Sequence, residues 1–156
     1  MSTRKPTPFT PEQERRGNAF IKLMSRFNTG LYRRTGGRVG AKFPGGAPVC
    51  LLTTTGRKSG EPRTMPLLYL RRGDDVVVVA SKGGFPNHPQ WYLNLLADPE
   101  VTIEIKRERL PMVARVADAD EKAEIWPELV AMYSSFDTYQ ARTERDIPVV
   151  ICSPRR

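Results

Sequence analysis

The turn at residues 56–60 combines the residue types that bind phosphate. Its sequence is Gly-Arg-Lys-Ser-Gly, and Arg63 follows three residues later. Glycine lets the backbone approach an anion closely, while arginine forks and a lysine point charge suit phosphate oxygens. The segment matches neither the P-loop pattern nor a dinucleotide-binding fingerprint. From these residues alone, a phosphate site and an ordinary charged hairpin turn both remain open.

A second loop, Ala-Ser-Lys-Gly-Gly at 80–84, follows the four valines of 76–79 and leads into the aromatic segment 87–95. Small residues at the end of a strand allow a planar ring to approach, and the start of a helix favours negative charge. His88 is either a general base or an ordinary solvated histidine. Trp91 either contacts a bound group or packs in the core.

Three aromatic residues, Tyr133, Phe136 and Tyr139, are spaced by three near the end of a helical region. Tyrosine offers an aromatic wall and a hydroxyl proton, so this stripe suits the lining of a substrate pocket; ordinary helix packing is the alternative. The sequence has no recognisable Ser-His-Asp set or paired-carboxylate motif, which argues against hydrolase chemistry.

The helices that must position these segments follow from the spacing of apolar residues. A helix is predicted over 12–33, and it either packs on the rest of the fold or rests on a membrane surface. Further helices are predicted over 89–97 and 118–142, with Pro127 expected to kink the latter or to start a fresh segment. The apolar stripe of the first helix consists of Phe20, Leu23, Met24, Phe27 and Leu31.

Strands are predicted where the apolar period changes to two. Pro66 falls inside the second strand and needs an edge or a bulge, because proline cannot donate to the ladder. Six short strands with few helices between them predict a mainly β fold of the α+β kind, a small barrel rather than a doubly wound sheet. The predicted strands are 48–55, 63–71, 76–81, 101–106, 110–117 and 148–153.

The length of 156 residues fits one domain. Three prolines favour a flexible arm over 1–11, which leaves 12–156 as a single domain. Cys50 and Cys152 are expected to be buried and reduced, and with one histidine available no metal site is expected. The chain shows neither an apolar run of spanning length nor a signal peptide, so a cytoplasmic location is expected.

The net charge of +8 is unevenly distributed. Residues 1–45 hold ten Lys or Arg against Glu12 and Glu14, while the remainder carries fifteen of each sign, so the whole excess of eight lies in the N-terminal segment. Such asymmetry favours an acidic partner, and nucleic acid, an anionic membrane and a polyanionic cofactor are all candidates.

Taken together, the chemical segments resemble one family. The stretches that carry the resemblance are LLTTTGRKSGEPRTMPL, VVVVASKGG, NHPQWYLNL, MYSSFDTYQ and IPVVIC. They are similar to, and occur in the same order as, those of the F420-dependent nitroreductase and quinone reductase family. The resemblance runs from near Phe20 to about Pro154 and therefore covers most of the chain.

This resemblance implies a split β-barrel of the FMN-binding, pyridoxamine-phosphate-oxidase-like kind with flanking helices, and reduced coenzyme F420, a 5-deazaflavin with a phospholactyl oligoglutamate tail. It assigns the tail to Arg57, Lys58, Ser59 and Arg63. It assigns the deazaflavin ring to Met65, Pro66, Leu67, Ala80, Ser81, Lys82, Gly83, Trp91 and Asn94. Hydride would pass directly to an organic acceptor, and the proton would come from Ser81, Tyr133, Tyr139 or water. The acceptor would lie near Leu23, Leu68, Tyr133, Phe136 and Tyr139.

Two departures bear on the acceptor. Phe136 and Leu68 stand where a nitroreductase of the family has tyrosines, so the resemblance favours quinone reduction over activation of nitroimidazoles. An enzyme acting on a membrane quinone gains from peripheral contact with an anionic membrane, whereas nucleic acid is a weaker expectation. An FMN-dependent oxidoreductase on the same fold and a non-catalytic protein that binds membrane or nucleic acid are the alternatives.

Overall fold

A computed structural model of the chain describes residues 7–38, 42 and 46–155; within the first helix the side chains of 20–22, 24 and 25 lie outside the description. Its helices are α1 (Pro11–Thr35), the short 3-10 turn η1 (Lys82–Gly84), α2 (Gln90–Ala97), α3 (Ala119–Met132) and α4 (Ser135–Arg142). Its strands are β1 (Val49–Thr55), β2 (Pro62–Arg72), β3 (Asp75–Val79), β4 (Glu100–Ile105), β5 (Glu108–Val116) and β6 (Val149–Pro154).

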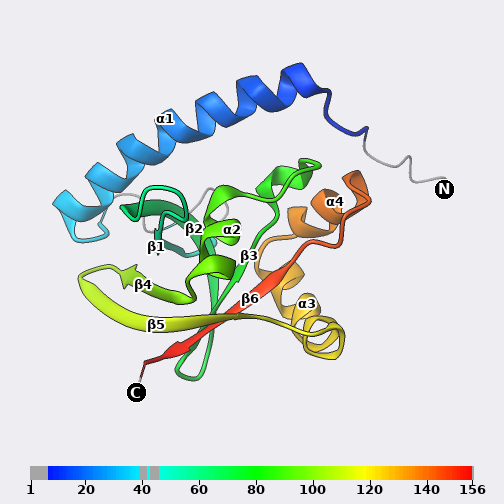
Figure 1. The fold of residues 1–156 in the computed structure, drawn as a ribbon. Coiled ribbons are helices and arrows are strands. Elements are labelled where there is room, and N and C mark those ends of the chain that lie inside the picture. The colour runs from blue at the N-terminus through cyan, green and yellow to red at the C-terminus, as the bar shows by residue number, and fades with distance from the viewer. Residues whose placement is uncertain (1–6, 39–41, 43–45, 156) are drawn as a thin grey trace.

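The strands form a closed antiparallel barrel in the order β1-β2-β3-β6-β5-β4. Alternate side chains of each strand point inward, as the pleat requires. The interior includes Cys50, Leu52, Val76, Val78 and Cys152, and α2 adds to the same core. Figure 1 shows the barrel with α1 running across one end and α3 and α4 against one side. The predicted barrel is confirmed.

Strand β2 resolves the question raised by Pro66. It pairs with β1 over residues 62–68, where Pro66 lies opposite Leu51, but it pairs with β3 only over 69–72. Pro66 therefore sits where one side of the strand has no neighbouring strand, and its missing N–H costs no ladder bond there. The predicted edge position is confirmed, because over residues 62–68 β2 pairs with β1 alone.

Helices α3 and α4 cover the outer face of β3 and β6. Ile125 and Leu129 pack there against Val77 and Val79. The prediction that a fresh helical segment starts at Pro127 is wrong. Pro127 lies inside α3, and the chain leaves the helix at Tyr133, whose φ of −148° and ψ of 96° are extended. Pro127 is exposed, so water can satisfy the carbonyl that loses its N–H partner.

Helix α1 begins and ends with strong capping signals. Thr10 and Gln13 form a reciprocal capping box, Pro11 occupies the first turn, and Gly36 closes the helix with a left-handed φ of 61°. Phe9 precedes the helix and stacks on Phe85, with ring centroids 4.2 Å apart. Residues 1–6 of the predicted arm lie outside the described residues, so the division into an arm and one domain stays a prediction.

The cysteines lie where the sequence predicts. Cys50 and Cys152 are free, and both are fully buried in the barrel core. Burial raises the pKa of both thiols, that of Cys152 to about 12. They are therefore packing residues held in the thiol form at neutral pH. Among the described residues, no helix has the length and apolar content needed to cross a bilayer.

Candidate functional site

The turn between β1 and β2 is closed by its own backbone. Gly56 donates to the Glu61 carbonyl at 2.8 Å, and Gly60, at a left-handed φ of 73°, donates to the Gly56 carbonyl at 2.7 Å. A side chain at Gly56 would meet the Ser59 hydroxyl. The tight closure turns the side chains of 57–59 outward, where all three are exposed.

Arg57 joins this turn to helix α2. Its backbone N–H and its guanidinium both donate to the Asn94 side-chain oxygen, at 3.2 and 2.9 Å, and the guanidinium also donates to Gln90 at 2.9 Å. Asn94 is 5% exposed and donates in turn to the Thr54 hydroxyl. Because the partners are neutral amides, the charge of Arg57 is held in place without being cancelled.

The other cations of the turn are free to meet an anion. Arg63 donates to the Ser59 hydroxyl at 3.4 Å and approaches the Glu61 carboxylate only to 3.7 Å, with both ion-pair partners exposed. Lys58 is exposed and makes no ion pair with a described residue. The turn therefore presents three positive groups against one distant carboxylate, a donor set that suits phosphate or carboxylate oxygens.

Strand β2 divides the predicted ring contacts between two faces. Met65 and Leu67 pack against the barrel interior, whereas Leu68 packs against the outer core beneath α3 and α4. The same alternation turns Pro66 outward. All four side chains are half-buried. Pro66 and Leu68 therefore lie on the outer face of the barrel, the side that packs against the aromatic cluster of Tyr133, Phe136 and Tyr139. Met65 and Leu67 lie on the other face.

The loop after β3 has an unusual backbone. Lys82, Gly83 and Gly84 all have positive φ, at 44°, 62° and 81°. A side chain at Gly84 would lie 2.7 Å from the Tyr139 carbonyl oxygen, so the loop presses closely on α4. Ala80 is fully buried and Ser81 is 9% exposed. This conformation places the loop between α2 and the aromatic cluster.

Two arginines hold that loop from behind, and sequence reasoning missed both. Arg145 donates to the carbonyls of Ala80, Ser81 and Phe85 at 3.1, 2.8 and 2.9 Å. Arg142 donates to the Gly83 carbonyl at 3.0 Å. Neither belongs to a motif, because the contacts span about sixty residues of sequence. Only the three-dimensional fold brings them to the loop.

Lys82, assigned to the cofactor by resemblance, points to helix α1. Its ammonium lies 3.8 Å from the Glu14 carboxylate, and both side chains are largely buried. Burial lowers the pKa of Lys82, and Arg145 lowers it further, while Glu14 opposes both effects. Glu14 also accepts from Asn87 at 2.6 Å. A single carboxylate therefore joins the start of α1 to both ends of the loop region.

Trp91 and His88 lie at the base of this region. Trp91 is 4% exposed and packs in the barrel core, at a right angle to the Tyr92 ring. His88 Nδ1 lies 3.3 Å from an Arg145 nitrogen. Since a guanidinium only donates, this contact needs a neutral imidazole with its proton on Nε2. Burial and Arg145 both lower the pKa of His88, which favours that neutral form.

The three predicted aromatic residues form one cluster. The hydroxyls of Tyr133 and Tyr139 lie 2.9 Å apart, and the ring of Phe136 meets that of Tyr133 edge-on at 5.0 Å. Phe136 is 4% exposed, so it belongs to the packed side of the cluster. Burial and the hydrogen bond with Tyr133 raise the pKa of Tyr139. Tyr139 therefore keeps its proton at neutral pH.

Leu23 is the one predicted acceptor contact that comes from α1. It is 67% exposed, and Phe27 one turn later is 63% exposed. Phe20 and Met24 of the predicted stripe have side chains outside the described residues. The C-terminal end of α1 is anchored by Arg33, which forms an ion pair with the buried Glu104 at 2.8 Å. Leu23 and Phe27, in the middle of the helix, face solvent.

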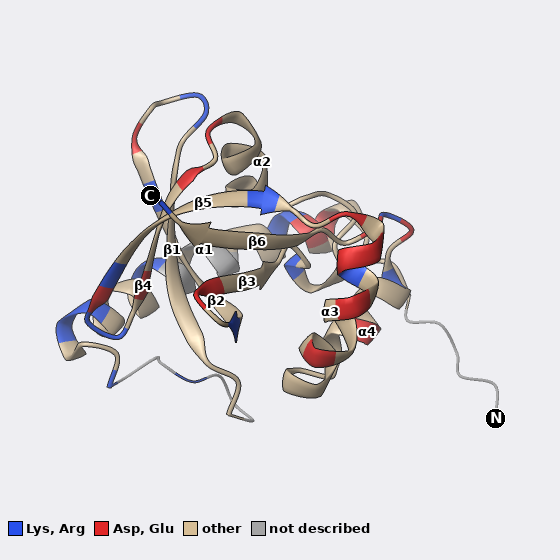
Figure 2. Ribbon diagram, turned by 90° about the horizontal axis from the view of Figure 1, so that it is seen from below, with Lys and Arg blue, Asp and Glu red and all other residues tan. Residues whose placement is uncertain are grey.

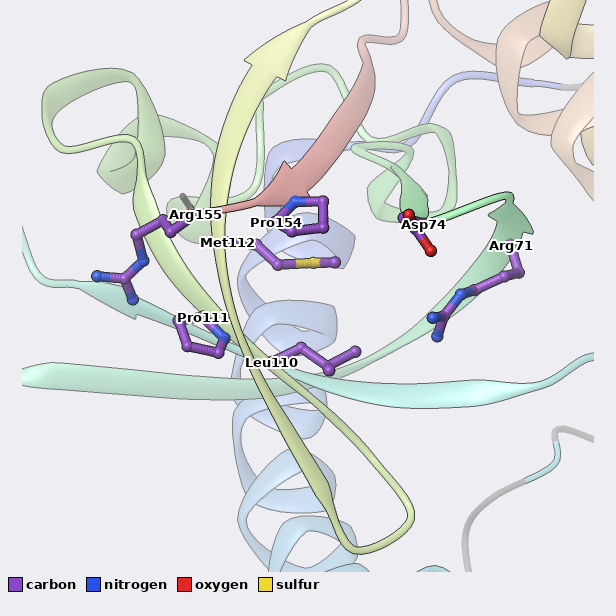
Figure 3. A pocket seen from close by; sticks show the side chains of 7 residues that line it. All are labelled: Arg71, Asp74, Leu110, Pro111, Met112, Pro154 and Arg155. Carbon is purple, nitrogen blue, oxygen red and sulfur yellow. The ribbon is translucent and has the colours of Figure 1, made fainter.

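Charge and shape separate this region from the rest of the barrel. Figure 2 shows the basic turn beside α2, with the acidic residues of α3 on another side of the barrel. A hollow of about 260 Å³ lies at the end of the barrel away from α1, where Arg71 and Asp74 face Arg155 across Leu110 and Met112 (Figure 3). It shares no lining residue with the turn, loop or cluster described above.

Comparison with known proteins gives a consistent answer. Residues 24–154 match the family described as F420H(2)-dependent quinone reductase. A putative F420H(2)-dependent quinone reductase of Mycobacterium tuberculosis is 46% identical over 118 residues, covering 76% of this chain and 99% of that protein. The chain belongs to this family. The predicted family membership is confirmed, and the matched region contains the turn, the loop and the aromatic cluster.

Solved structures agree with the family assignment. The structure of an F420-H2 dependent reductase is 40% identical, with a TM-score of 0.64, covering 68% of this chain and 94% of that one. A putative pyridoxamine 5'-phosphate oxidase from Listeria innocua, 16% identical with a TM-score of 0.50 over 69% of this chain and 84% of that one, shares the fold alone. The split-barrel expectation is confirmed.

Proposed function

We propose that this chain oxidises reduced coenzyme F420 and reduces a quinone by direct hydride transfer. The observation that carries the proposal is that the family match spans the basic turn, the loop after β3 and the aromatic cluster. Arg57 connects the turn to α2, and Gly84 connects the loop to α4. When bound, reduced F420 supplies the hydride, which protein side chains cannot.

The donor chemistry of the turn suits the cofactor's tail. Lys58, Ser59 and Arg63 would bind the phosphate and the glutamate carboxylates, because these side chains are exposed and only one carboxylate lies near them. Arg57 adds charge and fixes α2 through Asn94. Among the assigned ring contacts, the half-buried β2 side chains and the loop from Ala80 to Gly83 offer apolar contact and small residues. Trp91 and Asn94 are buried, so they would support the residues that contact the ring.

The protein supplies the proton that completes quinone reduction. A quinone becomes a hydroquinone when it gains one hydride and one proton. Tyr133 and Tyr139 share a hydrogen bond, and burial raises the pKa of Tyr139. Either hydroxyl could therefore pass a proton to the quinone and regain one from water. Ser81, on the loop that faces α4, is the third candidate donor. Phe136 and Leu68 would offer an apolar wall to the quinone ring.

Peripheral contact with an anionic membrane is a second proposal, at the inner face of the cell membrane. It rests on α1, where Leu23 and Phe27 are exposed and Arg26, Arg33 and Arg34 lie nearby in sequence on the same helix. Apolar burial and about 1 kcal/mol per basic residue near an anionic surface favour reversible association. Co-sedimentation with anionic vesicles should fall as salt rises. Absence of binding at low salt would leave α1 as a lid or packing element.

Spectral titration with F420 and with FMN tests the main proposal. Tight binding of F420 and weak binding of FMN are expected, since the basic turn suits a long anionic tail. Tight FMN binding without F420 binding would instead support an FMN-dependent oxidoreductase on the same fold. DNA binding that is independent of cofactor and falls steeply with salt would support the non-catalytic alternative.

A further inference from the structure

One guanidinium gathers the backbone of the loop that follows β3. Arg145 uses Nε for the Phe85 carbonyl at 2.9 Å, Nη1 for Ala80 at 3.1 Å and Nη2 for Ser81 at 2.8 Å. A further Nη1 contact reaches His88 Nδ1 at 3.3 Å. A guanidinium has five N–H groups that can donate hydrogen bonds. The four contacts of Arg145 are all made to residues 80–88.

Arg145 is itself fixed by its neighbours. The Gln140 side chain donates to the Arg145 carbonyl at 2.8 Å and accepts from the Ile147 N–H at 2.9 Å. The Thr143 hydroxyl accepts from the Arg145 N–H at 3.3 Å. The backbone of Arg145 is thus tied to α4 and to Ile147, which precedes β6 and belongs to the packed outer core. A rigid base lets the fork set the position of the loop.

The charge of Arg145 has no carboxylate partner among the described acidic residues, and the side chain is half-buried. Burial lowers its pKa, while the nearby Tyr92 opposes that effect. The carbonyls of Ala80, Ser81 and Phe85 are its hydrogen-bond partners in place of a carboxylate. The adjacent Asp146 pairs with Lys122 instead. A buried arginine is usually paired with a carboxylate. Arg145 instead binds three backbone carbonyls, so we interpret its role as fixing the geometry of the loop.

The loop needs such a hold. Lys82 lies at a φ of 44°, which L side chains adopt at a cost, and two glycines with positive φ follow it. No regular ladder covers these residues. Turning the Ala80 and Ser81 carbonyls toward the guanidinium fixes the direction of both peptide planes, and with them the position of the Ser81 side chain.

We infer that Arg145 is a positioning residue of the reductase, which holds Ser81 and the ring-facing loop at the geometry that hydride transfer needs. This inference rests on the proposed function, since it concerns the rate at which F420 reacts. A displacement of about 1 Å in such a group can cost about 100-fold in rate. Arg145 acts without touching the substrate, through the backbone of the loop.

Arg145→Lys is the decisive variant, because lysine keeps the charge and loses the fork that spans three carbonyls. We expect kcat to fall about 10- to 100-fold while the KM for quinone changes little. Arg155→Met is the control: Arg155 is exposed, but like Arg145 it donates to a backbone carbonyl, that of Val101 at 3.2 Å, at the far end of the barrel. It should leave kcat unchanged.

Two readouts separate positioning from simple stabilisation. Amide hydrogen exchange over residues 81–85 should accelerate in Arg145→Lys without cofactor, and millimolar guanidinium should restore part of the rate of Arg145→Ala without restoring its melting temperature. Wild-type kcat, F420 affinity and exchange in Arg145→Lys would overturn the inference. A wild-type protein that neither binds nor oxidises reduced F420 would instead overturn the proposed function, and the exchange measurement would still test the hold on the loop.

Discussion

The two loops of the candidate site use positive charge in opposite ways. In the turn at 56–60, Lys58 and Arg63 are exposed and nearly unpaired, so their charge is available to a ligand. In the loop at 80–85, Lys82 is paired with Glu14. Arg145 fixes this second loop by donating hydrogen bonds to its backbone carbonyls. The first loop can bind a ligand by charge, whereas cations give the second its shape.

This difference predicts which property each substitution should change. Removing an exposed cation from the turn should weaken ligand binding and leave folding intact. Disturbing the backbone of the second loop should change folding and geometry first. Each of the following substitutions is chosen to break or sharpen that contrast, beginning with the largest expected effect.

Gly84→Ala should cost the most stability. The new Cβ would lie 2.7 Å from the Tyr139 carbonyl at a φ of 81°. Left-handed strain of about 1–2 kcal/mol and overpacking of about 1–3 kcal/mol should add in the free energy of unfolding. Urea denaturation of the cofactor-free protein measures it. Gly83→Ala is the control, since its φ is also positive but its Cβ meets open space; equal losses in the two variants would show that the close approach to α4 is not a constraint.

Lys58→Ala and Arg63→Ala should each weaken F420 binding by about 1–3 kcal/mol, the value of one charge-assisted contact. Stability in urea should be nearly unchanged. Fluorescence titration of the cofactor measures the affinity, with Arg109→Ala on exposed β5 as the control cation. If both variants bind as tightly as the parent, the tail is held elsewhere and the contrast between the loops is lost.

Phe136→Tyr tests the proton supply beside the second loop. The new hydroxyl would enter a cluster where Tyr133 and Tyr139 already share a hydrogen bond. Nitroimidazole turnover should rise if proton delivery is the missing component, quinone reduction should change less, and stability should fall by about 1 kcal/mol. An unchanged or lower nitroimidazole rate in a folded, cofactor-bound variant would show that pocket shape limits this activity.

Acidification should produce the smallest effect, through His88. Its pKa is lowered in the folded protein, so the unfolded chain binds more protons as pH falls below the ordinary value of 6.5. The stability contributed by neutral His88 is therefore present above that pH and lost below it. The imidazole contacts Arg145 and Tyr92. Lys122, Asp118 and Asp146 line a surface hollow together with His88. The measurement is the urea midpoint of the wild type and of His88→Gln at neutral and at mildly acidic pH. The two midpoints should differ at neutral pH and approach each other at acidic pH. A difference that does not change with pH would rule out His88 as the titrating group.

The sequence predicted the strands well because the period of two is local and strong. The run of valines appears as β3, and the predicted strand at 63–71 appears as Pro62–Arg72. The sequence placed the break in the last helical region at Pro127, because proline usually interrupts a helix. Pro127 is instead tolerated inside α3, because it is exposed and water can bind the carbonyl that lacks an N–H partner. Tertiary surroundings decided that outcome.

The candidate site was predictable only in part. The basic turn is a local motif, so Arg57, Lys58 and Arg63 could be named from composition and resemblance. The hold of Arg145 on Ala80 and Ser81, and the pairing of Glu14 with Lys82, join residues far apart in the chain. No periodicity or spacing encodes such contacts. Arg57 and Lys82 accordingly have structural partners that the sequence did not indicate.

Single-turnover mixing with reduced F420 deuterated at C5 tests the central claim most directly. The protein, the cofactor and a soluble short-chain quinone would be combined without oxygen, and F420 oxidation and quinone reduction followed together. Direct hydride transfer predicts that both processes occur at one rate and that deuterium slows both equally. Two unequal rates, or oxidation no faster than in the absence of protein, would contradict the account.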